Sequence, residues 1–310
     1  MNLARSFRTI AQQSSFKALR WGFSAAAVAP PLAMYVANRI FYRPKRRPHP
    51  SGPDLPEVEE VAITVRGRRA VAYVAGTGRP VLMVHGWQAS AAHLAVLGRR
   101  FIEAGFRVVT FDMPAHGKSE GEETDITEIT ELGLQLSDRF GPFAAAVGHS
   151  YGAICLVNML HLGVSIERLI LLASPATYHG LVDRTCVLIG LSGKVRERFL
   201  DRINRRYAPY SYERDFNAVT NLSKHPIPTL VIHDSGDHEI PVGEAELLRH
   251  AHPQVNVMIT SRLGHNSIVK APAVVEACLS FIRDETGASP TPDASIDMPP
   301  DDRHIQGENR

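Results

Sequence analysis

Cysteine is scarce in this chain of 310 residues. The sequence holds only three, Cys155, Cys186 and Cys278, which is an odd number in unrelated surroundings. Cys155 and Cys278 fall on apolar faces of expected helices, where small buried thiols are ordinary. The pattern therefore implies no disulfide framework of the kind that holds small secreted domains together.

Acidic residues are missing from the first 53 positions, which hold nine Lys or Arg. The whole chain has 34 basic and 32 acidic residues and a net charge of +2, so the remainder, with 25 basic residues, carries −7. A negatively charged body lacks the basic footprint that nucleic acids require. We therefore predict no nucleic-acid partner.

Long apolar runs are also missing. The best candidate is the uncharged stretch from Trp21 to Asn38, whose eighteen residues barely suffice to cross a bilayer. Pro30-Pro31 lies in its middle and is expected to kink any helix there. Basic residues flank the stretch on both sides, which suits lipid headgroups but is too even to fix an orientation.

Three interpretations of residues 1–56, which end in a linker rich in proline and basic residues, are open. We favour a membrane anchor or interfacial segment through residues 21–38. The second is a cleaved targeting peptide, because the start of the chain is rich in Arg and Ser and free of acid. The third is a soluble helical arm packed on the domain. The expected localisation is membrane-associated or cytoplasmic.

Apolar strands alternate with amphipathic helices over residues 57–285, and 44% hydrophobic content suffices for one large core. The alternation predicts a single α/β domain with a mostly parallel, doubly wound sheet. The expected strands are 58–65, 69–74, 80–84, 106–111, 143–147, 167–173, 229–233 and 255–260, and the expected helices are 91–104, 124–139, 151–162, 242–251 and 271–283. Residues 286–310 are rich in Pro, Asp and Ser without apolar periodicity, and we predict a disordered tail.

The stretch FAAAVGHSYG, residues 143–152, organises the rest of the chain. A strand that turns abruptly into a helix strains the backbone of the residue at the turn, so its neighbours two positions away must lack bulk. Gly148 and Gly152 stand at both places around Ser150. The turn exposes the Ser150 hydroxyl at a helix N-terminus. This position predicts that Ser150 acts as a nucleophile.

A serine hydroxyl attacks only when a histidine takes its proton, and that histidine needs a carboxylate to orient it. His265 follows an expected strand and so lies at the same sheet edge as Ser150, whereas His250 and His252 precede one. Asp234 and Asp237 are both candidates for the carboxylate.

Four motifs in order, His85-Gly86-Trp87, the Ser150 turn, Gly236-Asp237 and Gly264-His265, resemble those of serine hydrolases in the α/β-hydrolase superfamily. The resemblance covers roughly residues 60–285. It implies that Ser150 is the nucleophile, His265 the base and Asp237, in preference to Asp234, the acid. It also implies an oxyanion hole from the backbone N–H groups of Trp87 and Tyr151, with support from His85, Gly86, Gly148, His149 and Gly152.

The resemblance further implies a small helical cap at about residues 178–225 and no cofactor. Asp112 and His116 precede the nucleophile and are expected to be structural. One cluster could be mistaken for a metal site, namely His233, Asp234, Asp237, His238 and Glu239. Strand alternation sends His233 and Asp234 to opposite faces, so we expect no metal.

The function that these residues favour is hydrolysis of carboxylic esters or thioesters through an acyl-enzyme, with a small-molecule ester or acyl compound as substrate. Two alternatives use the same fold and triad, a C–C bond hydrolase and a cofactor-free perhydrolase. The third is a catalytically silent, membrane-associated interaction module, against which all three filled triad positions argue.

Overall fold

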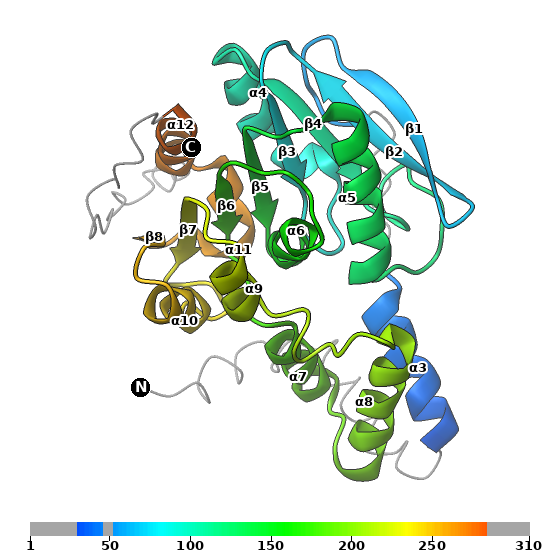
Figure 1. Cartoon of the computed structure of the whole chain (residues 1–310). Coiled ribbons are helices and arrows are strands. Elements are labelled where there is room, and N and C mark those ends of the chain that lie inside the picture. Colours follow the sequence, from blue (N-terminus) through cyan, green and yellow to red (C-terminus); the bar gives the residue numbers. More distant parts are fainter. Residues whose placement is uncertain (1–29, 46–51, 284–310) are drawn as a thin grey trace, which may run out of the picture.

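The computed structural model describes residues 30–45 and 52–283, which are built around one sheet of eight strands (Figure 1). The spatial order of the strands is β1-β2-β4-β3-β5-β6-β7-β8. β1 and β2 pair antiparallel, as do β2 and β4, and the other pairs are parallel. The strands are β1 (Glu59–Val65), β2 (Arg68–Ala75), β3 (Pro80–Val84), β4 (Arg107–Asp112), β5 (Ala145–His149), β6 (Leu169–Leu172), β7 (Thr229–Asp234) and β8 (Asn256–Thr260).

Helices cover both faces of the sheet because its parallel strands are apolar on both sides. In β3, Leu82 and Val84 join one core cluster, and Val81 and Met83 join the other. One face carries the 3₁₀ turn η1 (Ala91–Leu94), α4 (Ala95–Glu103), α11 (Gly264–Ser267), η2 (Ile268–Lys270) and α12 (Pro272–Arg283). The other carries α5 (Ile126–Phe140), α6 (Tyr151–His161), α9 (Ala218–Lys224) and α10 (Gly243–Ala251). The expected doubly wound sheet is confirmed.

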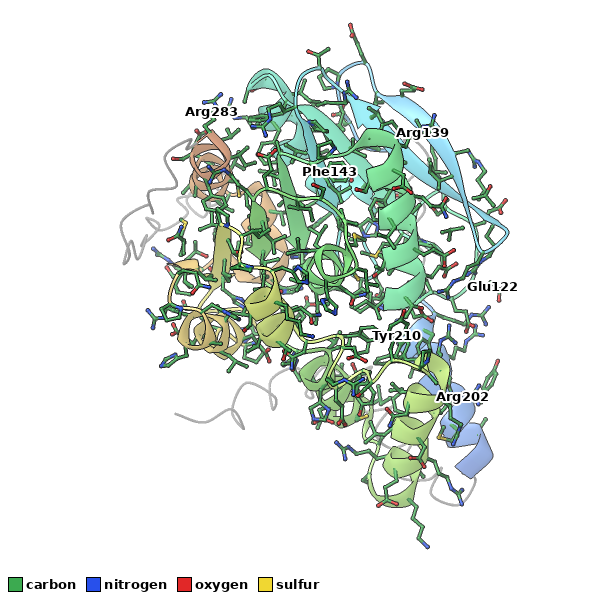
Figure 2. All side chains as sticks on the ribbon, viewed as in Figure 1. Glu122, Arg139, Phe143, Arg202, Tyr210 and Arg283 are labelled. Carbon is green, nitrogen blue, oxygen red and sulfur yellow. The ribbon has the colours of Figure 1, made fainter. Side chains whose placement is uncertain are left out.

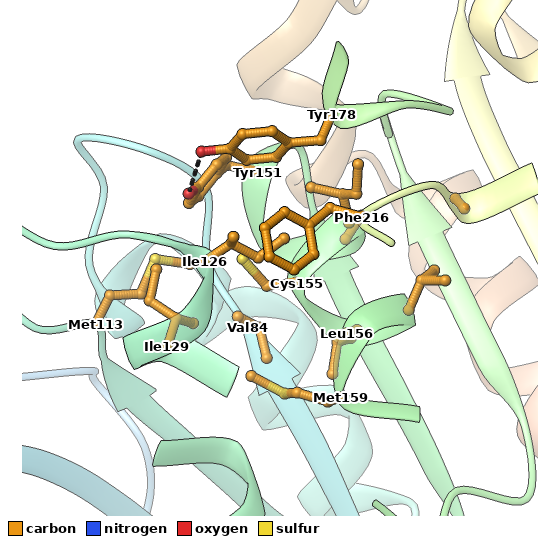
Figure 3. Packing of buried hydrophobic residues seen from close by; sticks show 14 of the residues in the cluster. Val84, Met113, Ile126, Ile129, Tyr151, Cys155, Leu156, Met159, Tyr178 and Phe216 are labelled. Atoms are coloured by element: carbon orange, nitrogen blue, oxygen red, sulfur yellow. Dashed lines mark hydrogen bonds between the residues drawn. The ribbon is translucent and has the colours of Figure 1, made fainter. Parts of the chain in front are cut away.

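The segment between β6 and β7 forms α7 (Tyr178–Ile189), α8 (Gly193–Tyr207) and α9. α9 packs against α6 and so belongs to the layer that covers the sheet. α7 and α8 lie beyond that layer, at the bottom of Figure 1. Their buried tyrosines, with Phe216, pack over the start of α6, as Figure 3 shows for Tyr178 above Tyr151. These two helices therefore make a small helical cap.

α3 (Pro30–Tyr42) lies along α8, far from the start of the sheet (Figure 1). Pro30 and Pro31 stand in the first turn of the described helix, and the kink expected between this helix and residues 21–29 lies outside the described residues. A proline in the first turn removes an N–H that has no partner within the helix, so it costs little there. The remaining residues of the predicted membrane segment, 21–29, lie outside the described residues.

The C-terminal end of α3 is fixed by the cap and by α5. The Phe41 ring packs edge-on against Phe199 of α8, with centroids 5.6 Å apart. The Arg206 guanidinium lies 4.1 Å from the Tyr42 ring centroid, and its Nε donates to Asp125 Oδ2 at 2.8 Å. Asp125 also caps the N-terminus of α5. Residues 30–42 therefore pack as an arm on the domain, and within the described ranges no helix is long and apolar enough to span a bilayer.

We predict that α3 stabilises the fold through Tyr42, which is 2% exposed. Tyr42→Ala should lower the free energy of unfolding by roughly 3 kcal/mol, because it removes a large buried ring. Tyr35, on the same helix, is 61% exposed, and Tyr35→Ala should change the stability by less than about 0.5 kcal/mol. Urea unfolding of both variants makes the test, and equal losses would contradict the packed position of Tyr42.

Candidate active site

Ser150 stands at the junction between β5 and α6, with φ 54° and ψ −120°. This conformation is strained for a residue with a side chain. A Cβ on Gly152 would overlap the backbone oxygens of Val84 and His85, and a Cβ on Gly148 would overlap Ala153. The two glycines therefore allow the tight turn that the sequence predicts, and the Ser150 hydroxyl lies at the carboxyl edge of the sheet.

Three predicted site residues meet at this edge from three separate segments of the chain, namely the β5–α6 turn, the loop after β7 and α11. The Ser150 hydroxyl lies 2.9 Å from His265 Nε2. His265 Nδ1 lies 2.7 Å from Asp237 Oδ2. With the proton on Nδ1, the imidazole donates to the carboxylate and accepts from the serine. A proton can therefore pass from the hydroxyl to the ring.

Asp237 is held by its own loop. Its Oδ1 accepts hydrogen bonds from the backbone N–H groups of Glu239 at 2.8 Å and Ile240 at 2.9 Å. Oδ2 is left for His265, with His233 Nε2 at 3.6 Å. His233 Nε2 also lies 2.9 Å from the Ile240 carbonyl oxygen, to which it can donate. The carboxylate thus has a fixed orientation toward the imidazole.

Asp234, the rival carboxylate, points elsewhere. It accepts from the Gly236 N–H at 2.9 Å, from the Thr260 hydroxyl at 2.8 Å and from the Leu263 N–H at 3.0 Å. These bonds keep the pKa of Asp234 below its ordinary value, although burial acts to raise it. The geometry brings Asp237, and not Asp234, to His265.

The loop after β3 lies directly against the Ser150 turn. His85 is fully buried, and its Nε2 accepts from the Met113 N–H at 3.0 Å while its Nδ1 lies 2.7 Å from the Gly86 oxygen, as a donor. A Cβ on Gly86 would come within 2.9 Å of His149 Nδ1 and 3.2 Å of Ser150 Cβ. Only glycine lets the two loops approach so closely.

Two backbone N–H groups are available beside the serine. Tyr151 is the first residue of α6, where an N–H has no partner within the helix. Among the hydrogen bonds of the described residues, none uses the N–H of Trp87 as donor. The Trp87 and Tyr151 rings are in edge contact, with centroids 5.2 Å apart. Both N–H groups belong to the two loops that meet at Ser150.

His149 lies behind the site, 2% exposed. Its Nε2 is 2.8 Å from the His265 carbonyl oxygen, which fixes it as the donor. Burial lowers the pKa of His149 well below the ordinary value, so the ring is neutral. The side chain predicted as support therefore holds the backbone of the residue predicted as base.

Asp112 and His116 have structural partners, as expected. The Asp112 carboxylate accepts from Tyr73 Oη and from the N–H groups of Ala91 and Lys118, each at 2.8 Å. His116 Nε2 accepts from the Gln88 N–H at 3.1 Å, next to Trp87. Both side chains shape the loops that surround the site.

The sequence did not predict Glu239 as a residue of the active site. Its Oε2 lies 3.8 Å from His265 Nε2, and its Oε1 accepts from Asn266 Nδ2 at 3.1 Å. Its position two residues after Asp237 was the available signal. The contact between the Tyr151 and Tyr178 hydroxyls, at 3.5 Å, was also missed, because it joins the cap to α6. Within the described ranges, no three His, Cys, Asp or Glu side chains are grouped to hold a metal ion.

The sequence matches the model of the "Alpha/beta hydrolase family" over residues 81–277, which is more than half of the chain. A curated relative, named as a candidate non-heme haloperoxidase of Mycobacterium phage D29, is 31% identical over 103 residues. That match covers 32% of this chain and 37% of the phage protein, so the chain spans little more than a third of the relative.

Solved structures share the fold at low sequence identity. An esterase of Pyrococcus furiosus is 18% identical with a TM-score of 0.58, and the match covers 78% of this chain and 96% of the esterase. A bromoperoxidase of Bacillus anthracis is 21% identical with a TM-score of 0.57, over 73% of this chain and all of that one. At these identities the likeness shows the fold alone.

We predict an acid-sensitive fold from the buried His85. Burial lowers its pKa from 6.5 to about 4. As the pH falls below 6.5, the unfolded chain binds a proton that the folded chain does not, so the free energy of unfolding should fall by roughly 3 kcal/mol by pH 4. Urea unfolding between pH 7 and pH 4 measures this slope.

The control separates His85 from the other histidines. His85→Asn should make the slope shallower, whereas His250→Asn, at an exposed position, should leave it unchanged. A slope that is the same in all three proteins would rule out His85 as its source.

Proposed function

The chain belongs to the alpha/beta hydrolase family, and we propose that it is a serine hydrolase of carboxylic esters or thioesters that works through an acyl-enzyme. The observation that carries this proposal is the bonded series of Ser150, His265 and Asp237, at 2.9 and 2.7 Å. Such a series makes a serine hydroxyl nucleophilic, because the imidazole accepts its proton and the carboxylate stabilises the charged ring.

In acylation, Ser150 Oγ attacks the carbonyl carbon of the substrate while its proton moves to His265 Nε2. The oxygen of the tetrahedral intermediate becomes negative and is bound by the N–H groups of Trp87 and Tyr151. The proton then passes from Nε2 to the leaving alcohol or thiol, and the acyl group stays on Ser150. In deacylation, water attacks the acyl carbon while its proton moves to His265 Nε2. The bond between the acyl carbon and Ser150 Oγ then breaks, the proton returns to Oγ and the carboxylic acid leaves.

The arrangement around the imidazole supports this cycle. Asp237 is buried, with its second oxygen occupied by two backbone N–H groups, so it presents one orientation to His265. The His149 bond to the His265 carbonyl fixes the other side of the same residue. A base held at two points loses little entropy when the transition state forms.

A second candidate reaction is perhydrolysis without a cofactor, in which hydrogen peroxide replaces water in deacylation. The names of the phage relative and of the Bacillus anthracis structure favour it. Peracid formation from acetate and peroxide, followed by bromination of monochlorodimedone, tests it beside a series of p-nitrophenyl esters of increasing chain length.

The first prediction concerns Ser150. Ser150→Ala should abolish covalent labelling by a fluorophosphonate and lower ester turnover on the order of 10⁴-fold or more, since the nucleophile is lost. The circular dichroism spectrum should stay unchanged, because the hydroxyl stands at a surface turn. Undiminished labelling of the variant would sink the assignment, and failure of the wild-type chain to react would favour a silent interaction module.

A separate prediction distinguishes the two carboxylates. Asp237→Asn should lower kcat by about 10⁴-fold, because the imidazole loses its negative partner. Asp234→Asn should lower kcat far less, and should reduce thermal stability, because Asp234 holds three donors of neighbouring loops. The reverse ranking of kcat would assign the acid to Asp234.

A further inference from the structure

The solvent face of α8 carries a stripe of basic side chains. Lys194, Arg198, Arg202 and Arg205 are all exposed and are spaced four, four and three residues apart. This spacing places them on one side of the helix. Phe199, Ile203 and Tyr207, which are buried against the cap, lie on the other side. We call these four residues the α8 basic face.

Within the described residues the α8 basic face forms no ion pair, although Glu197 and Asp201 are also exposed on α8. Two other arginines of the helix have acidic partners, since Arg196 pairs with Asp183 and Arg206 pairs with Asp125. Among the ion pairs of the described residues, none includes a member of the α8 basic face. Figure 2 labels Arg202 on α8, on the side of the molecule where α3 lies. These charges are therefore available to an external anion.

The charge of α8 contrasts with the rest of the body. The helix holds six basic and two acidic residues, whereas the other positions between 54 and 283 hold 17 basic and 23 acidic residues. Acidic protein surface is repelled by an anionic surface, so within residues 54–283 the attraction is concentrated on α8. The asymmetry gives the chain one orientation toward such a surface.

α3 adds apolar groups beside this face. Leu32 is 58% exposed and Tyr35 61% exposed, and both share a side of the helix with the exposed Arg39. Ala37 and Phe41, on the opposite side, pack toward the core. Because α3 runs along α8, the apolar pair and the basic stripe belong to the same end of the molecule (Figure 1).

We propose that the α8 basic face, with Leu32, Tyr35 and Arg39 of α3, docks the protein on a bilayer that contains anionic phospholipids. The basic side chains bind headgroup phosphates, and the Leu and Tyr side chains enter the boundary between headgroups and acyl chains. A single-stranded nucleic acid offers phosphates as well, but nothing that matches an exposed leucine. The proposal does not depend on the catalytic one.

The test uses the full chain and sedimentation with vesicles. One set is phosphatidylcholine alone, and the other contains about 30% phosphatidylglycerol. The variant Arg198→Glu/Arg202→Glu/Arg205→Glu reverses the stripe. Its matched control is Lys224→Glu/Lys270→Glu/Arg283→Glu, which changes the net charge equally at exposed positions on other helices. Figure 2 shows Arg283 far from Arg202.

We expect the wild-type chain to bind the anionic vesicles more tightly than the neutral ones, and binding to weaken as salt is raised. One basic residue near an anionic surface contributes roughly fivefold, so the stripe variant should bind at least about tenfold more weakly. The control variant should bind like the wild type. Leu32→Ser/Tyr35→Ser should weaken binding in high salt as well, since its contribution is apolar.

The proposal would be overturned if the stripe variant bound anionic vesicles as tightly as the wild type. It would also be overturned if both triple variants lost vesicle binding equally, or if the wild type bound neutral and anionic vesicles equally. Preferential binding of the α8 basic face to a single-stranded RNA would also contradict the proposal, because the partner would then be a nucleic acid and not a bilayer. An unchanged circular dichroism spectrum and an unchanged midpoint of urea unfolding show that the variants are folded.

Discussion

The backbone conformation of Ser150 is the constraint on which the site depends. With φ at 54° it costs about 1–3 kcal/mol and persists only where the surroundings fix it. The Ser150 N–H donates to the Leu172 oxygen of β6 at 2.8 Å, and Gly152 lies against the end of β3. Strands on both sides of β5 therefore hold the turn, and the proposed nucleophile is positioned by the sheet and not by its own loop.

Buried carboxylates hold the loops around the Ser150 turn in place. Asp112, Asp234 and Asp237 each accept at least two hydrogen bonds from backbone N–H groups at the carboxyl edge of the sheet. A buried carboxylate is tolerable only when such donors satisfy it, and the donors are thereby fixed. Only Asp237 keeps an oxygen for His265. Asp237 thus both supports its loop and bonds to the proposed base.

The elbow and the order of the motifs could be predicted from sequence because they depend on local features, namely glycines beside Ser150 and polar residues at strand ends. The choice between Asp234 and Asp237 rested on resemblance, since the two stand three residues apart in one loop. The two differ in which carboxylate oxygens already accept hydrogen bonds from neighbouring groups. The bond from His149 to the His265 carbonyl joins residues 116 positions apart, so no local pattern predicts it.

The cap was predictable in place but not in its contacts, because Arg206 meets Tyr42 and Asp125 only in the folded chain. Those contacts give α8 two opposite roles. Its inner residue Tyr207 lies 2.7 Å, hydroxyl to hydroxyl, from Tyr178, which approaches Tyr151 at 3.5 Å, beside the nucleophile. Its outer face is the basic stripe. Two hydroxyl contacts therefore connect the inner side of α8 to Tyr151, while the outer side of the same helix faces solvent.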